Sequence, residues 1–359
     1  MNTHDILDTF RGKKVFITGH TGFKGSWLSF ILNEIGANIF GFSIDKPEDV
    51  RHAYYALNID SFLNNLDNAM GDVRDYEHLA RSISKVKPDF LFHLAAQPIV
   101  STSYVDPFKT FSTNVNGTLN VLEFLRQDDS ELTGIIITSD KCYKNKEQMV
   151  PYVESDEMGG DDPYSASKGA AELIIHSYLT SFPKILKSKG TVSVRAGNVF
   201  GGGDWSKNRL IPDCVRDIFQ KGEVEIRMPE AVRPWTYILD ILFGYLMLAA
   251  KIKKNPCYFS GSWNFASGET RTVREIVQAF INSLGTGKLC LNPLNNIGKE
   301  SALLLIDPTK ANKKLNWSCK MNLDDSIKVT ADWYQSQKNG LNMVDYSRSL
   351  LAKYYLNNN

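Results

Sequence analysis

The sequence predicts an α/β fold, in which a doubly wound parallel sheet carries helices on both faces and a smaller C-terminal lobe follows. Three observations support this prediction. Short apolar runs alternate with helical patterns through the first half of the chain, as crossover units of a parallel sheet require. These runs are apolar at successive positions, as expected where helices cover both faces. After Arg195 the chain becomes rich in Gly, Pro and charge, which indicates a second lobe.

The expected elements follow in chain order. The expected strands are Lys14–Thr18, Ile39–Ser43, Phe90–Leu94, Gly134–Thr138, Thr191–Arg195 and Trp263–Phe265, within a sheet expected to have about seven strands. The expected helices are Ser26–Gly36, Thr113–Arg126, Ser165–Leu179 and Tyr237–Lys253, with a short arm over 1–12 and two or three helices in 268–359. The pattern therefore predicts a first domain of residues 1–195 and 235–267 and a second lobe of residues 196–234 and 268–359.

The composition is that of a globular chain with no need of metal or disulfides. Of its 359 residues, 43% are apolar, and 41 basic against 40 acidic residues leave a net charge of +1. Such a balance argues against nonspecific nucleic-acid binding and against a polybasic membrane patch. The five cysteines form no CxxC pair or zinc spacing. Together with the lack of an apolar leader or a membrane-length run, this predicts a cytoplasmic protein.

A glycine-rich turn closes the first predicted strand. It reads Gly19-His20-Thr21-Gly22-Phe23-Lys24-Gly25. Glycines at this spacing let the backbone turn tightly and approach a pyrophosphate, while the following helix presents free N–H groups to the anion. The position after the first strand of an alternating pattern favours this interpretation over an ordinary turn. The turn therefore predicts a Rossmann-type site for NAD.

The sequence does not determine which residue binds the adenosine ribose. A carboxylate is expected about 20 residues beyond the turn. Asp45 stands at that distance from Gly25, but Ser43 ends the second predicted strand. A carboxylate here favours NAD over NADP because it repels a 2′-phosphate, although Lys46 and Arg51 weaken that inference.

Tyr164 and Lys168 are four residues apart and therefore share one face of a predicted helix. An ammonium beside a phenol favours the phenolate and lowers the phenol's pKa. Such a tyrosine exchanges a proton with a sugar hydroxyl while a nicotinamide takes the hydride. By itself, the Tyr164–Lys168 spacing also fits a solvated helix face. In a chain that also carries the glycine turn upstream, the same spacing predicts a catalytic pair.

Together these residues resemble the extended short-chain dehydrogenase/reductase family, from about residue 12 to 268. Supporting segments are His93–Gln97, Asn114–Thr118 and Arg195–Gly201. The resemblance implies NAD and a nucleotide-sugar substrate. The remaining expected NAD contacts are Asp72 and Val73, whose alternative is a surface turn, and Leu94, Ala95, Ala96, Asn114, Tyr164 and Lys168. The resemblance also implies a homodimer that forms through the helices Thr113–Arg126 and Ser165–Leu179. The apolar residues expected to face outward on these helices fit burial in the core of one subunit equally well; they are Leu119, Leu122, Leu173 and Ile174.

The second lobe is expected to hold the nucleotide. Guanidinium forks match phosphates, so Arg209 and Arg233 are candidates for the diphosphate, and Asn198 for a phosphate. Gly201–Trp205 is expected to be a flexible loop, and Trp205 or Trp235 to stack on the base or line the pocket. The alternative is structural tryptophans and surface arginines. Gln97 is a further expected substrate contact.

Ser139, Asp140 and Lys141 follow the strand Gly134–Thr138, at the sheet edge where ligands bind. In the family, a residue like Ser139 binds the sugar 4-hydroxyl. Oxidation at C4 acidifies the C5 proton; a base then removes it, an acid protonates the departing C6 hydroxyl, and the hydride returns to C6. Asp140 would be the acid and Lys141 would stand where dehydratases have a glutamate base. A lysine is a base only if its pKa is depressed. The alternative to these catalytic roles is that Asp140 caps a helix and Lys141 is an ordinary surface lysine.

The Asp-Lys pair resembles the branch of 4,6-dehydratases that act on CDP-glucose, rather than on dTDP- or GDP-sugars. Further agreeing segments are Gly19–Trp27, Arg195–Trp205 and Arg233–Asp240. The base preference rests on resemblance alone. His20 and Lys24 are typical of this branch, and we expect them to alter NAD affinity. The alternatives are a nucleotide-sugar 4-epimerase, a dehydratase for another nucleotide sugar, and a non-catalytic NAD sensor, which would need no proton-transfer groups.

Overall fold

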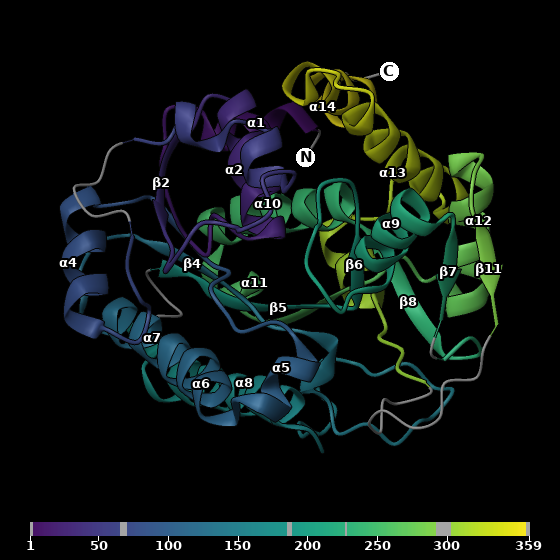
Figure 1. Cartoon of the computed structure of the whole chain (residues 1–359). Helices are drawn as coiled ribbons and strands as arrows, with labels where there is room; N and C mark the ends of the chain where they lie inside the picture. Colours follow the sequence, from purple (N-terminus) through teal and green to yellow (C-terminus); the bar gives the residue numbers. More distant parts are fainter. Residues whose placement is uncertain (1–2, 65–69, 185–188, 227, 292–302, 357–359) are drawn as a thin grey trace.

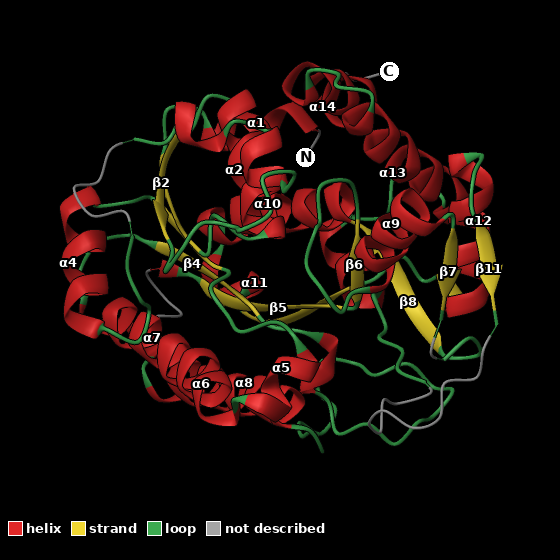
Figure 2. Ribbon diagram, viewed as in Figure 1, coloured by secondary structure: helices red, strands yellow, loops and turns green. Residues whose placement is uncertain are grey.

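The protein is described from a computed structural model, which covers residues 3–64, 70–184, 189–226, 228–291 and 303–356. Its centre is a six-stranded parallel sheet (Figures 1 and 2). The strands, in spatial order, are β2 (Asn38–Phe42), β1 (Lys14–Thr18), β3 (Phe90–His93), β4 (Thr133–Ile137), β5 (Thr191–Ala196) and β9 (Gly261–Phe265). The predicted doubly wound sheet is confirmed, with one strand fewer in this sheet than expected.

Helices cover both faces of the sheet (Figure 1). These helices are α1 (Thr3–Phe10), α2 (Phe23–Glu34), α3 (Ala53–Ala56), α4 (Tyr76–Val86), α5 (Val100–Val105), α6 (Pro107–Phe111), α7 (Gly117–Gln127), α8 (Pro163–Ser181), α10 (Ile238–Lys254) and α11 (Pro256–Phe259). Alternation along β1 explains the two layers. Val15 and Ile17 pack with α2 and α10, whereas Phe16 packs with α4 and α7.

The second lobe has its own small sheets. A three-stranded sheet has the order β10 (Thr270–Thr272), β8 (Val232–Tyr237), β6 (Asn198–Phe200), and β11 (Lys288–Cys290) pairs with β7 (Glu223–Glu225). The helices of this lobe are α9 (Leu210–Lys221), α12 (Val273–Leu284), α13 (Leu323–Lys338) and α14 (Met343–Leu351). Asn198 begins β6 beside β8, directly after Gly197 and the end of the main-sheet strand β5 at Ala196.

The segment Gly201–Trp205 is buried, so the expected flexible loop is wrong. Trp27 of α2 donates its indole N–H to the Gly202 carbonyl at 2.9 Å, and the Tyr334 hydroxyl donates to the Asp204 carbonyl at 2.7 Å. A Cβ on Gly202 would lie 2.2 Å from the Trp333 ring, so only glycine fits there. This packing fastens the second lobe onto α2.

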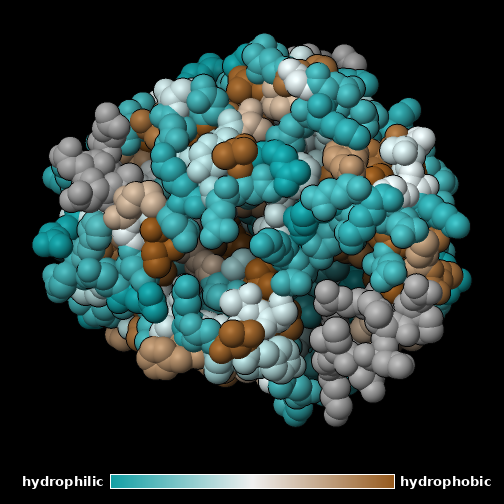
Figure 3. Space-filling view, viewed as in Figure 1, coloured by the Kyte–Doolittle hydropathy of each residue, from teal (hydrophilic) through white to brown (hydrophobic). Residues whose placement is uncertain are grey.

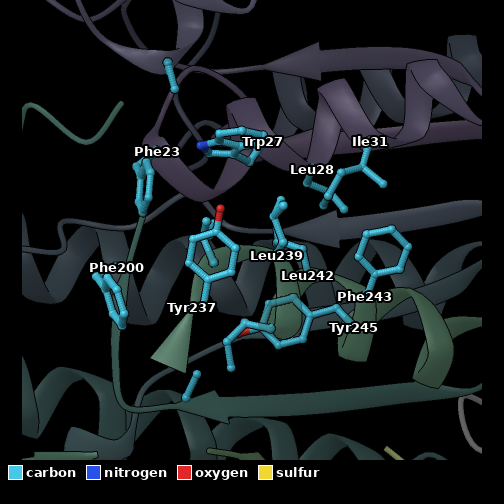
Figure 4. Close-up of a cluster of buried hydrophobic side chains, with 14 of the residues drawn as sticks. Phe23, Trp27, Leu28, Ile31, Phe200, Tyr237, Leu239, Leu242, Phe243 and Tyr245 are labelled. Carbon is cyan, nitrogen blue, oxygen red and sulfur yellow. The ribbon is translucent and has the colours of Figure 1, made fainter. Parts of the chain in front are cut away.

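Both candidate tryptophans of the second lobe are buried. Trp205 meets Tyr334 edge-on at 5.4 Å, and the Trp235 indole N–H donates to the Arg271 carbonyl at 3.1 Å. Their indole groups are therefore occupied by the protein interior, as in the structural alternative. Figure 4 shows the neighbouring aromatic cluster, in which Phe23 and Trp27 of α2 face Phe200 and Tyr237 of the second lobe. The glycine turn and the second lobe thus share one hydrophobic core.

The expected helix Thr113–Arg126 is wrong in its first turn. A π-helical turn covers Ser112–Asn116, and α7 follows it. The surface shown in Figure 3 is mainly hydrophilic, with separate apolar patches. Within the described part of the chain, every helix is too short or too polar to cross a lipid bilayer.

Candidate active site

The glycine turn folds back on itself at the carboxyl edge of β1. A Cβ on Gly19, whose φ is +74°, would lie 2.6 Å from the Ala95 nitrogen, and one on Gly25 would lie 2.1 Å from the Gly19 carbonyl oxygen. The Gly22 residue that precedes α2 makes no side-chain cap. The first backbone N–H groups of the helix therefore lack a side-chain acceptor, which suits an anion. These features fit the pyrophosphate of NAD.

The closed turn leads to a first prediction. Replacing Gly25 with Ala is expected to destabilise the ligand-free protein by about 1–3 kcal/mol, because the added methyl group overlaps backbone atoms that cannot rotate away. Gly22→Ala is the matched control, since its Cβ would lie 3.4 Å from its nearest neighbour at an ordinary φ of −71°. Thermal unfolding measures both variants. Equal melting temperatures would contradict the close packing described here.

His20 points away from the turn's surface and into the interior. Its Nδ1 lies 2.9 Å from the Ser43 Oγ, and a Cβ on Gly41 would overlap its ring at 2.5 Å. Burial lowers the His20 pKa to about 4, so the imidazole is neutral near pH 7. The Ser43 hydroxyl is thus engaged inside the protein, whereas Asp45 is exposed.

Lys24 lies among charged groups from several elements. Burial, together with Arg209 and Lys168, lowers the pKa of Lys24 to about 7, and Asp140 opposes this shift. The electrostatic contacts place the Lys24 ammonium near the catalytic pair of α8 and the second lobe. The structure therefore separates the two residues of the turn: His20 fills space beneath it, and Lys24 brings charge to the site.

Asp72 and Val73 lie in the turn before α4. Arg74 donates to the Asp72 carboxylate through its backbone N–H at 2.9 Å and its Nε at 2.8 Å. This ion pair lowers the Asp72 pKa. Val73 is buried, and its methyl group would overlap a Cβ on Gly117 at 2.7 Å. The pair forms a fixed turn whose carboxylate is held by its neighbour.

Leu94, Ala95 and Ala96 lie half-buried where β3 ends. Asn114 fixes the chain beyond them: it accepts from the Gln97 N–H at 2.8 Å and donates to the Ser167 Oγ of α8 at 2.9 Å. The Gln97 amide donates to the Ile99 carbonyl and the Thr110 hydroxyl. Both Gln97 amide hydrogens are donated within the protein, and a contact between Gln97 and the substrate stays a prediction.

Ser139 and Asp140 form a compact hydrogen-bonded unit after β4. The Ser139 hydroxyl donates to the Asp140 Oδ1 at 2.9 Å and accepts from the Lys141 N–H at 3.3 Å. The Asp140 Oδ2 is buried without a hydrogen-bond partner. Burial raises the Asp140 pKa, against the opposing effects of Lys141, Ser139 and Arg233. A buried, unpaired carboxyl oxygen favours the protonated form, which is the form a general acid needs.

Tyr164 and Lys168 lie in the first turns of α8, which begins with Asp162 as its cap and Pro163. Burial raises the Tyr164 pKa to about 12, while a hydrogen bond with Ser139 opposes the shift. The expectation of a lowered Tyr164 pKa is therefore wrong, because desolvation outweighs the hydrogen bond with Ser139 and the charge of Arg209. Burial also lowers the Lys168 pKa to about 8.

The second lobe adds two arginines to the site. Arg233 is buried and its charge acts on Asp140, and Arg209 pairs with Asp204 at 3.4 Å while its charge acts on Tyr164. Beside Asp140, a Cβ on Gly197 would lie 3.3 Å from the Oδ2, so the residue before Asn198 borders the acid. The cations that gather here are Lys24, Lys168, Arg209 and Arg233. Such a cluster suits a diphosphate.

Comparisons with known proteins agree with this geometry. A sequence model of the family described as GDP-mannose 4,6 dehydratase matches residues 16–330. The CDP-glucose 4,6-dehydratase of Salmonella typhimurium is 40% identical, over 96% of this chain and 97% of that protein. The CDP-paratose 2-epimerase of Salmonella typhi is 33% identical, over 90% of this chain and 99% of that protein.

Solved structures share the fold. The dTDP-glucose 4,6-dehydratase of Streptomyces venezuelae, solved with NAD, has a TM-score of 0.77 at 21% identity and covers 91% of this chain and 98% of its own. An epimerase from Methanothermobacter thermautotrophicus has a TM-score of 0.78 at 22% identity and covers 96% and 98%. The resemblance predicted from the sequence is confirmed: the chain belongs to the GDP-mannose 4,6 dehydratase family, among the extended short-chain dehydrogenases/reductases.

Proposed function

We propose that this chain catalyses the NAD-dependent dehydration of CDP-glucose to CDP-4-keto-6-deoxyglucose. The observation that carries the proposal is the buried Asp140, whose Oδ1 accepts from Ser139 while its Oδ2 has no hydrogen-bond partner, and whose charge acts on Tyr164. An epimerase has no water to expel and no need of such an acid. The 40% identical relative named CDP-glucose 4,6-dehydratase supports the choice of nucleotide.

NAD, when bound, supplies the hydride acceptor and donor of the reaction. The first domain, which carries the central parallel sheet, would hold it through the backbone of the glycine turn and the edge at Leu94–Ala96. A dehydratase and an epimerase of similar structure were solved with NAD bound, which supports this assignment. The second lobe, which carries the sheet β10–β8–β6, would hold the nucleotide sugar, with Arg209 and Arg233 at its diphosphate.

The remaining chemistry belongs to this chain's own side chains. Tyr164 takes the proton of the sugar C4 hydroxyl, and Ser139 holds that hydroxyl in place. The Lys168 ammonium stabilises the phenolate as it forms. Lys141 removes the acidified C5 proton, and Asp140 gives its proton to the departing C6 hydroxyl, so that one water leaves. Lys141 then returns its proton to C5 as the hydride reaches C6.

The second candidate is a nucleotide-sugar 4-epimerase. Relatives at 23% identity carry the name UDP-glucose 4-epimerase, and their reaction would use Tyr164 and Lys168 equally well. A mass measurement separates the candidates. The protein is incubated with NAD and, in turn, the CDP-, dTDP-, UDP- and GDP-linked forms of glucose or mannose. Loss of one water from CDP-glucose alone supports the proposal. Epimer interconversion without a mass change would replace it with the second candidate.

We also propose that the protein is a cytoplasmic homodimer. All five cysteines are unpaired, which supports a reducing compartment. α5 and α6 pack against α8, and apolar side chains are exposed on all three helices: Val105 at 86%, Phe108 at 80% and Leu173 at 59%. Of the residues expected to face outward, Leu122 instead packs in the core with Ile175. Exposed apolar side chains on three helices that pack together fit contact with a second copy of the chain.

Adding a charge to this surface is expected to separate the subunits. Light scattering after size exclusion should report a monomer for the double variant Val105→Asp, Phe108→Asp, because burying two carboxylates in an apolar interface is costly. Met149→Asp is the matched control, as Met149 is equally exposed (77%) but lies in the loop before α8. A dimer that survives the double substitution would exclude α5 and α6 from the interface.

A further inference from the structure

A buried ion pair lies between α8 and the central sheet, next to the catalytic residues. The Arg195 Nη2 of β5 donates to the Glu172 Oε2 of α8 at 2.6 Å. Their side chains are 3% and 1% exposed. The pairing lowers the Glu172 pKa against the effect of burial, so the carboxylate stays ionised. A buried ion pair of this kind is costly to desolvate, so a contribution to stability alone does not explain its presence.

Glu172 holds the chain just before Ser139. The Thr138 hydroxyl donates to the Glu172 Oε1 at 2.5 Å, and the Thr138 N–H donates to the Val194 carbonyl at 2.9 Å. The second carboxylate oxygen accepts from Ser193 at 2.9 Å. Thr138 is therefore fixed both to the neighbouring strand and to α8.

Arg195 holds the chain just after Cys142. Its Nη1 donates to the Tyr143 hydroxyl at 2.7 Å and to the Glu154 carbonyl at 3.1 Å. The Tyr143 hydroxyl in turn donates to the Asn264 Oδ1 of β9 at 2.7 Å. The Tyr143 ring stacks on Tyr152 at 5.2 Å and 14°, which restricts it further. One ion pair thus anchors both ends of the segment 139–142.

The same glutamate belongs to the helix of the catalytic pair. Glu172 is four residues beyond Lys168 and eight beyond Tyr164, so the three lie near one face of α8. We propose that Glu172, together with Arg195, is a positioning residue that sets Ser139 and Asp140 in register with Tyr164 and Lys168 and holds Lys168 in its charged form. The inference rests on the proposed function for the roles of those four residues.

The charges around Lys168 agree with this role. Burial lowers the Lys168 pKa, whereas Cys142 after β4 and Glu172 on its own helix raise it. Lys24 of α2 also faces Lys168, whose charge lowers the Lys24 pKa. His93 of β3, which also faces Lys168, is neutral because burial lowers its pKa to about 3. Glu172 is thus the ionised carboxylate that raises the Lys168 pKa. Removing its charge must lower that pKa and shorten the pH range in which Lys168 is protonated.

Two substitutions test the two parts of the proposal. Thr138→Val keeps the ion pair but loses the hydroxyl, and displacement of Ser139 is expected to lower kcat about 10- to 100-fold with an unchanged KM. Glu172→Gln is expected to lower the Lys168 pKa by about one unit and to move the alkaline limb of the rate profile equally. Lysine-selective NMR titration follows Lys168 directly, with its signal assigned by its absence from Lys168→Arg.

Asp128→Asn is the matched control. Asp128 accepts from the buried Lys189 ammonium at 2.6 Å, near the opposite ends of β4 and β5. This variant is expected to lose stability while kcat and the Lys168 pKa stay unchanged. If Thr138→Val and Glu172→Gln behave like Asp128→Asn in kcat and in the Lys168 titration, the pair is merely structural and the proposal is overturned.

The experiments distinguish a failure of the positioning role from a failure of the proposed function. If the wild-type protein converts none of the nucleotide sugars, the proposed function fails, yet the NMR titration of Lys168 still decides whether Glu172 controls its charge. If Glu172→Gln does not fold, Thr138→Val decides the positioning role, because it removes one hydrogen bond and leaves both buried charges paired. An unchanged kcat in that variant would overturn the positioning role.

Discussion

Asp140→Asn is expected to stop the loss of water while leaving the oxidation at C4 in place. Asparagine keeps the volume of the side chain and an acceptor for the Ser139 hydroxyl, but it has no proton to give to the departing C6 hydroxyl. General acid catalysis contributes about 10²- to 10⁴-fold, so dehydration should slow by at least about 100-fold. The reduced nicotinamide should then accumulate. Its absorbance and the mass of the sugar product measure the two half-reactions separately.

Lys141→Ala is expected to give the same separation of half-reactions if Lys141 removes the C5 proton. Lys144→Ala is the matched control: it lies three residues further on, is exposed, and its Nζ pairs with Glu157 at 2.7 Å. That variant should dehydrate CDP-glucose at the wild-type rate. If Lys141→Ala also retains that rate, Lys141 is a surface lysine and another group is the base.

The pH dependence of Asp140 has a definite sign. Its pKa in the folded protein is raised above the ordinary value of 3.8, so the folded state binds more protons than the unfolded state between these two pKa values. Asp140 therefore contributes stability below pH 3.8 that is lost as the pH rises through the raised pKa. Asp140→Asn removes this loss, so at neutral pH the variant should unfold at the same or a higher temperature. That result would show that its slow dehydration does not come from misfolding.

Local patterns predicted the catalytic edge well because each motif is contained within one turn. The spacing of Gly19 and Gly25 follows from backbone contacts inside the turn itself, and the Tyr164–Lys168 spacing follows from helix geometry. The alternating strands and helices likewise predicted the order of the first domain. Such features depend on neighbours in the sequence.

The features that sequence patterns missed depend on partners far along the chain. Gly202 is a glycine because Trp333 fills the space beside it, and a run of glycines by itself suggests mobility. The Gln97 amide donates to the Thr110 hydroxyl, a contact that no local pattern in the sequence indicates. Glu172 had a usable signal, since it stands one helical turn beyond Lys168. Its significance appears only when Arg195 and Thr138 are seen to converge on it.

Tyr164→Phe is expected to abolish both half-reactions. The substitution keeps the buried ring and removes only the hydroxyl, so the C4 hydroxyl loses its proton acceptor and about 10²- to 10⁴-fold in kcat should be lost. In contrast to Asp140→Asn, no reduced nicotinamide should accumulate, because Tyr164 acts before the elimination. The difference between the two variants orders the steps along the reaction.

Tyr178→Phe provides the control on the same helix. Tyr178 lies nearer the other end of α8, where its hydroxyl donates to the Glu123 Oε2 at 3.0 Å, and its loss should leave the rate unchanged.

The alkaline limb of the rate profile gives a second test. Since the Lys168 pKa is about 8, the ammonium that stabilises the Tyr164 phenolate is lost as the pH rises through that value, and the rate should fall with it. Lys168→Arg keeps its charge at every pH of the titration, so its residual activity should lack this limb. If the limb persists in Lys168→Arg, the group that titrates is not Lys168, and the phenolate must be stabilised by another of the cations around the site.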